Sequence, residues 1–271
     1  MKHLTGTLQL FALALLCGCG GGGERGGSLP SGPSSSSLDI TGNWQVSLTS
    51  TLQGTSPTTI SGGITQSGNS VNGTVHVGGS NCFDQLMTIG ITGTLTGNNV
   101  SLTSTTVAGQ VVSLTASISN NELSGTYAIH GGCADGDQGS ASGFKIPSFS
   151  GRWRSGFEIN DQHFYGLADV TQGSVSSAGS FGIGGEVDDS GNVGCLSGTI
   201  SPGMFPSPSF IIGSSLSLEI ETSDGTIVFL GTLNQAGTEF IGTHHIVGGT
   251  CNGFLGGACF GRDFHALCHL P

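Results

Sequence analysis

The tetrapeptide TGNW, at positions 41–44, returns as SGRW at 150–153, and the segments after each copy correspond as well. LSGTYAIHGGC (123–133) corresponds to FIGTHHIVGGTC (240–251), and a cysteine ends both segments. Shorter matches add to the correspondence: ITQ (64–66) with VTQ (170–172), and the sequence around Cys82 with that around Cys195. The repeats predict that the chain contains one unit twice.

The apolar residues of each unit recur with a period of two. In SVNGTVHV (70–77), Val71, Val75 and Val77 share one face of an extended chain, and polar residues share the other. This alternation indicates a β-strand with one buried face, because a helix would repeat its apolar residues every three to four positions. Turn signals such as SNN (119–121) separate the runs.

The spacing of these runs predicts an all-β fold with two tandem antiparallel meander barrels of about eight strands each. We place the units at 39–148 and 149–271, each about the length of a small domain. A β-sandwich remains the alternative architecture. The strands expected in the first unit lie near 41–50, 58–66, 70–77, 86–96, 99–107, 110–119, 122–130 and 140–146.

Gly42-Asn43-Trp44 and Gly151-Arg152-Trp153 stand at the start of the first strand of each unit. A Gly-X-Trp in this place resembles the lipocalins and avidins, whose tryptophan plugs the closed end of an eight-stranded barrel. Each unit is similar to the helix-free avidin type in particular. The resemblance implies a ligand site inside the barrel, and the candidate ligand-binding residues are Trp44, Tyr127, Trp153 and His244.

We expect the interior of both barrels to be apolar. An eight-stranded barrel can hold one small ligand, or its side chains can fill it completely. The inward-facing residues that the alternation predicts are Trp44, Val75, Ile89, Leu114, Tyr127, Trp153, Phe181, Leu218, Phe240 and His244.

The first residues have the pattern of a bacterial export signal, with Lys2 before the apolar run LQLFALALL (8–16). LCGC (16–19) resembles the lipobox of bacterial lipoproteins, which implies cleavage before Cys19 and a lipid on that cysteine. With cleavage before Cys19, residues 1–18 are the lipoprotein signal peptide. An ordinary secretory signal is the alternative. The Gly after Cys19 resembles lipoproteins sent to the outer membrane.

Gly, Ser and Pro dominate the segment from 19 to 38, which therefore cannot bury enough apolar surface to fold. We interpret it as a flexible tether to the membrane. Without residues 1–18 the chain carries five basic and seventeen acidic residues, a net charge of −12. This charge argues against nucleic acid as a partner. We therefore expect a lipid-anchored protein of the cell envelope, in the outer membrane.

Six cysteines remain after the signal and Cys19 are set aside, and an even number in an exported chain implies disulfides. The repeat suggests the pairs Cys82–Cys133 and Cys195–Cys251, which leaves Cys259–Cys268 as a third pair. Six cysteines allow fifteen connectivities, so these pairings rest on the repeat alone.

Histidines, cysteines and aspartates are the candidate metal ligands. His244 and His245 are neighbours in a strand and should point to opposite faces, so both cannot bind one ion. The C-terminal group Cys251, Cys259, His265, Cys268 and His269 could suggest zinc, but disulfides compete for its thiols. Asp135 and Asp137 have the spacing of a calcium loop without its downstream Glu, and we favour a solvated turn. No metal and no cofactor are predicted.

No G-x-S-x-G, H-E-x-x-H or C-x-x-C motif occurs in the mature chain. SPGMFPSPSF (201–210) is a long connection where the first unit has only the turn TGNN, and it could act as a lid or partner contact or simply pack down. The sequence predicts a non-catalytic protein that binds a small apolar ligand in a barrel. The alternative is a structural protein that binds another envelope protein, and an enzyme ranks last.

Overall fold

The computed structural model describes residues 38–52, 57–83, 87–159, 162–189, 198–200, 208–223, 225–249, 252–253 and 255–262. All of these ranges are strands, turns or connections, except for one short 3-10 turn, η1 (Gly132–Ala134). The all-β class predicted from the alternation is confirmed.

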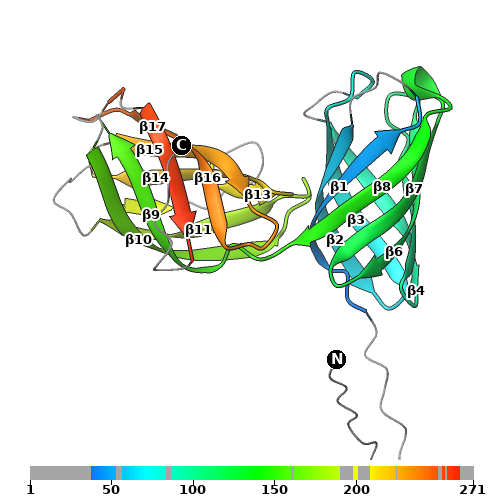
Figure 1. Ribbon diagram of the computed structural model, residues 1–271, viewed down its shortest axis with the longest axis horizontal. Helices are drawn as coiled ribbons and strands as arrows, with labels where there is room; N and C mark the ends of the chain where they lie inside the picture. Colours follow the sequence, from blue (N-terminus) through cyan, green and yellow to red (C-terminus); the bar gives the residue numbers. More distant parts are fainter. Residues whose placement is uncertain are drawn as a thin grey trace, which may run out of the picture. The chain divides into compact units, whose positions relative to one another are not determined.

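The first unit forms a closed antiparallel barrel in which each strand pairs with its neighbour in sequence and β8 pairs with β1 (Figure 1). The expected strands match the observed ones closely, and several differ by no more than one residue. Asn120 and Asn121 both have positive φ (52° and 64°), as the predicted two-residue hairpin turn requires. The strands are β1 (Gly42–Ser50), β2 (Thr58–Ser67), β3 (Ser70–Gly78), β4 (Thr88–Thr96), β5 (Asn99–Ser104), β6 (Val111–Ser119), β7 (Glu122–His130) and β8 (Gln138–Ile146).

The second unit closes in the same way, because β9 pairs with both β10 and β17, and β10 pairs with β11. Each barrel therefore leaves no long open edge among the described strands. The strands are β9 (Gly151–Ile159), β10 (Gln162–Val175), β11 (Phe181–Asp189), β12 (Gly198–Ile200), β13 (Phe210–Ile212), β14 (Ser215–Thr222), β15 (Gly225–Leu233), β16 (Glu239–Val247) and β17 (Leu255–Gly261).

The sequence predicted the 201–210 connection at the counterpart of the TGNN turn of the first unit, and this prediction is wrong. Both β12 and β13 pair with β11 on one side and β14 on the other, so they are two halves of one strand position. The insertion thus interrupts a strand, and the counterpart of the TGNN turn is the later turn at Gly213 and Ser214. Local turn signals could not distinguish these positions, because a split strand is visible only in its pairing partners. Residues 201–207 lie outside the described part of the chain.

The repeated motifs make the same hydrogen bonds in both barrels. The indole Nε1 of Trp44 donates to the carbonyl oxygen of Ile40, and that of Trp153 donates to Phe149, each at 2.8 Å. The amide of Ile40 donates to Oε1 of Gln66 at 2.9 Å. The amide of Phe149 donates to Oε1 of Gln172 at 2.8 Å. The glutamines of ITQ and VTQ therefore fix the entry of the first strand in each copy, which confirms the internal repeat.

The residues predicted to face inward are all buried, and each barrel has its own apolar core. Trp44 is 2% exposed and Trp153 is fully buried. Since the inward side of the strands is mostly apolar, closing the sheet removes that apolar surface from water.

Two turns of the second barrel contact the outer face of β1–β3. The side chain of Asn43 donates to the carbonyl of Gly213 at 2.8 Å and accepts from its amide at 2.7 Å. The amide of Gly63 donates to the carbonyl of Gly179 at 2.8 Å. A Cβ on Gly63 would lie only 2.1 Å from Val175, so this contact requires glycine. No sequence motif predicted these contacts, because they join residues more than a hundred positions apart.

Candidate functional site

The interior of the first barrel contains a cavity of about 50 Å³. Its wall is almost wholly apolar and includes Trp44, Val75, Ile89, Val100 and Leu114. Sites for small organic ligands typically measure about 300–1,000 Å³. The side chains therefore nearly fill this barrel, and the space that remains is close to that of a small packing defect.

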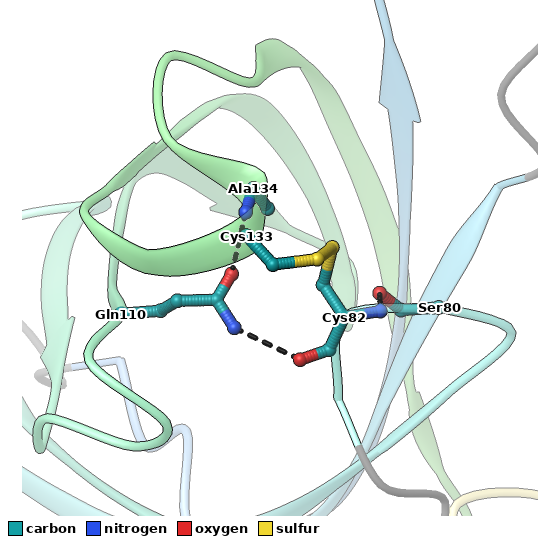
Figure 2. Close-up of a disulfide and its surroundings, with 5 residues drawn as sticks. All are labelled: Ser80, Cys82, Gln110, Cys133 and Ala134. Atoms are coloured by element: carbon teal, nitrogen blue, oxygen red, sulfur yellow. Dashed lines mark hydrogen bonds between the residues drawn. A yellow bond between two sulfur atoms is a disulfide. The ribbon is translucent and has the colours of Figure 1, made fainter.

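Both ends of the first barrel are covered. Trp44 lies near the start of β1, where it pairs with Lys145 of β8, and its indole is buried. At the other end, the β3–β4 and β7–β8 connections are joined by the disulfide Cys82–Cys133, with 5.6 Å between the Cα atoms (Figure 2). Phe83 beside this bridge is 6% exposed and belongs to the core. The predicted pairing of these two cysteines is confirmed.

Gln110 strengthens this cap, although no pattern in the sequence points to it. Its side chain is 1% exposed, donates to the carbonyl of Cys82 at 2.9 Å and accepts from the amide of Ala134 at 3.0 Å (Figure 2). It thereby ties both disulfide-linked connections to a third one. Gly132 has a φ of +61°, and a Cβ there would lie 2.3 Å from Gln110. Only glycine fits beside this glutamine.

Tyr127 is buried beside the same cap and does not line the cavity. Its hydroxyl donates to Oδ2 of Asp137 at 3.1 Å, and Oγ of Ser50 donates to Oδ1 of the same carboxylate at 2.5 Å. Burial raises the pKa of Tyr127, and the charge of Asp137 and the hydrogen bond to it raise it further. Asp135 accepts from the amide of Gly131 at 2.7 Å. The two aspartates thus hold turns rather than sharing one ion.

The interior of the second barrel is occupied by stacked aromatic rings. Phe149 stacks on Trp153 at 4.3 Å between ring centroids, and Phe260 packs edge-on against Phe229 at 5.4 Å. All four side chains are fully buried. Outside this core, the guanidinium of Arg262 lies 4.6 Å from the Trp153 ring and covers it. Close packing of buried rings is typical of a structural core.

His244 and His245 point to opposite faces, as predicted. His244 is 2% exposed and its ring lies 5.9 Å from that of Phe229, whereas His245 lies on the partly exposed outer side. The candidate residues are therefore not gathered in one site. Trp44 and Tyr127 lie toward opposite ends of the first barrel, and Trp153 and His244 belong to the second.

Cys259 is disulfide-bonded, and its partner lies outside the described residues. The other predicted disulfide cysteines, Cys195, Cys251 and Cys268, also lie outside them, as does the lipid-attachment residue Cys19. Within the described ranges, no group of three or more His, Cys, Asp or Glu side chains is arranged to hold a metal ion. His265 and His269 of the proposed zinc cluster are not described.

The outer walls of the two barrels differ in chemistry. The second carries the ion pair of Arg152 with Asp169, whose closest atoms are 2.9 Å apart, and this hydrogen bond lowers the pKa of Asp169. It also exposes four aliphatic side chains on β15–β17: Leu230, Ile241, Val247 and Leu255.

The first barrel instead has an outer wall of serines and threonines, hollowed by two grooves of about 490 and 470 Å³. Both grooves are open to solvent, unlike the enclosed interior cavity.

A third hollow of about 460 Å³ lies where the turn after β13 meets the outer face of β1–β3. His76 contributes to it and is 8% exposed, with Nε2 of its ring 2.8 Å from the carbonyl oxygen of Ala178. Gln45 Oε1 accepts from the amide of Ser214 at 2.8 Å beside it. Its polar groups are thus already used in joining the two barrels.

Among the described residues, no helix has the length and apolar character needed to cross a bilayer. Comparison with family models, with curated proteins and with solved structures finds no match to this chain. The class of protein is therefore defined by the fold alone: a tandem pair of eight-stranded antiparallel barrels, which fits the small barrels of the calycin type.

Proposed function

We propose that this chain is a lipid-anchored, non-catalytic protein of the bacterial cell envelope that acts through the outer surface of two solid barrels. Cys19 carries the lipid, residues 19–38 form the tether, and the barrels are held away from the membrane. The outer membrane is the proposed location.

The size of the internal cavity carries the proposal. A void of about 50 Å³ is several times smaller than the site of an ordinary organic ligand. The disulfide-linked cap and Trp44 also cover the two ends of this barrel. Binding at the outer surface requires neither opening the cap nor displacing core side chains, so it costs no packing energy.

Binding of a small apolar molecule inside the first barrel is the second candidate. The almost wholly apolar wall of the cavity favours it, because such a site would remove the apolar surface of a ligand from water. A guest larger than the present void would need the wall to expand, which works against the close packing of the core.

Native mass spectrometry of the protein purified from its own envelope distinguishes the two candidates. We expect the mass of the processed, lipidated chain with no further small molecule. A retained apolar compound that is lost on filling the cavity with Val100→Phe would contradict the proposal, because it would place a ligand inside the barrel.

The anchor is tested by substituting each cysteine of LCGC in turn. We expect Cys19→Ala to move the protein from the membrane fraction to the soluble fraction, since each buried CH₂ of an acyl chain contributes about 0.8 kcal/mol to membrane binding. Cys17→Ala is the matched control and should leave the protein in the membrane. Equal behaviour of the two variants would contradict lipidation at Cys19.

A further inference from the structure

The outer face of β6, β7, β8 and β1 carries hydroxyl side chains in aligned rows. One row consists of Ser117, Ser124, Ser142 and Ser47, which are paired neighbours on four successive strands. Neighbouring strands lie about 4.8 Å apart, so the four side chains form a short ladder.

A second row runs parallel to the first, two residues further along each strand. It consists of Thr115, Thr126, Ser140 and Thr49, and all four side chains are exposed. The hydroxyls of Ser124, Thr126, Ser140 and Ser142 make no hydrogen bond to other groups in the described part of the chain. They are therefore available to a ligand. We call the outer face of these four strands the hydroxyl track.

The two grooves lie in line along this track. The groove of about 490 Å³ is lined by Ser117, Ser124 and Ser142, and that of about 470 Å³ by Thr115 and Thr126. β7 has nine residues and runs beneath both, which gives the track a length of about 30 Å. An elongated ligand fits this arrangement better than a compact one.

Charge is almost absent from the hydroxyl track. At the outward-facing positions of its four strands, all of which are described, Glu122 is the single Asp, Glu, Lys or Arg. About 25% of the residues of a typical soluble protein are charged, against 8% in this chain, so the track shares the low charge of the whole molecule. A strongly charged partner would lose hydration at this face without gaining an ion pair, so a neutral partner is favoured.

The composition of the track also argues against the other common partners. Protein interfaces are built on aromatic and Arg anchors and are poor in Ser. Strand addition is excluded for this wall because its four strands are already paired on both sides. Nucleic acid would require Lys and Arg.

We propose that the hydroxyl track binds an extended neutral polysaccharide, an inference that rests on the proposed function. Sugar hydroxyls both donate and accept hydrogen bonds, as Ser and Thr hydroxyls do. Asn120 supplies an amide at one end of the larger groove. Gln45 and Glu122 lie beside it, and one side-chain oxygen of each accepts from the second barrel, from Ser214 and Gln235 respectively. Phe144 packs against the core of the second barrel, and the part of its side chain that lines the same groove is apolar, as the C–H face of a sugar ring is.

The test uses isothermal titration calorimetry on the mature lipoprotein, in a detergent without a sugar headgroup. The probes are three neutral oligosaccharides: cellopentaose, maltopentaose and fully N-acetylated chitopentaose. We expect at least one of them to bind with a dissociation constant in the millimolar range or tighter.

Ser124→Lys places a long charged side chain in the centre of the track and should weaken that binding by about tenfold or more, as expected for losing one or two hydrogen bonds. Ser70→Lys is the matched control, because Ser70 is an exposed serine at the start of β3, outside both grooves and separated from β6 by two strands. It should bind as the parent does.

The absence of binding by all three probes overturns the proposal, and so does binding that Ser124→Lys leaves unchanged or that Ser70→Lys weakens equally. These outcomes are separate from those for the proposed function. A small molecule retained inside the barrel would refute solid barrels while leaving the hydroxyl track as it is.

Discussion

At the scale of single residues, a few buried or partly buried polar groups decide how each barrel is closed. Gln66 and Gln172 hold the backbone before the first strand, Gln110 holds the disulfide cap, and Asp137 accepts from Ser50 and Tyr127. A buried donor or acceptor that loses its partner costs about 1–3 kcal/mol, so these positions tolerate little change.

Tyr127 should make the first barrel sensitive to alkali. Its folded-state pKa is raised above the ordinary value of 10.0, so the neutral phenol is favoured in the folded protein. The stability that this contributes is fully present below pH 10 and is lost as the pH rises through the raised pKa. We expect Tyr127 to ionise above pH 10, together with loss of the fold.

Absorbance of the phenolate measures this directly. The chain has only two tyrosines, so Tyr165→Phe leaves Tyr127 as the single reporter. Tyr127→Phe is the complementary variant and should remove the late transition. Ionisation of Tyr127 at or below pH 10 in the folded protein would contradict the raised pKa.

At the scale of the strands, the first barrel is well packed but not completely. Valines from several strands converge on the cavity, and each lacks the methylene that would fill it. Val71 is buried in the same core but does not line the cavity. This difference allows the size of the void to be measured by substitution.

Val100→Ile should stabilise the first barrel by up to about 0.8 kcal/mol, the value of one buried methylene, because the cavity has room for it. Val71→Ile should destabilise the barrel by about 1 kcal/mol or more, since it adds the same group to packed surroundings. Urea unfolding curves of the two variants make the comparison. Equal destabilisation by both would mean that the void is not available to a methylene.

At the scale of the whole molecule, the two barrels contact each other through turns of the second and the outer face of the first. Asn43 is central to this contact, because it is 2% exposed and satisfies both backbone groups of Gly213. The disulfide Cys82–Cys133 closes a segment of 51 residues, worth about 4 kcal/mol in the chain-entropy model, but its effect is confined to the first barrel.

Asn43→Ala should weaken the coupling between the barrels, because the amide and carbonyl of Gly213 lose their partners at a cost of about 1–3 kcal/mol. Each barrel has one tryptophan, so fluorotryptophan labelling gives each its own NMR signal during unfolding. We expect the unfolding midpoints of the two barrels to move apart. Asn72→Ala, at an exposed asparagine of β3, is the control, and an identical response to both substitutions would contradict the coupling.

Much of the fold could be predicted from the sequence, because alternation along a strand and turn residues between strands are local properties. SVNGTVHV and the SNN turn predicted their elements well, and the inward positions of Trp44, Tyr127, Trp153 and His244 followed from the same alternation. The repeat also predicted Cys82–Cys133. The lipid at Cys19 stays a prediction from its motif.

The all-β class and the duplicated unit are already present in the sequence, since the period of the apolar residues and the recurrence of the motifs can be counted along the chain. Three features became visible only in the folded barrels: the almost full interior, the split strand of the second barrel, and the line of serines across four strands. Cavity volume and register depend on residues far apart in the chain, and these residues meet only when the sheet closes.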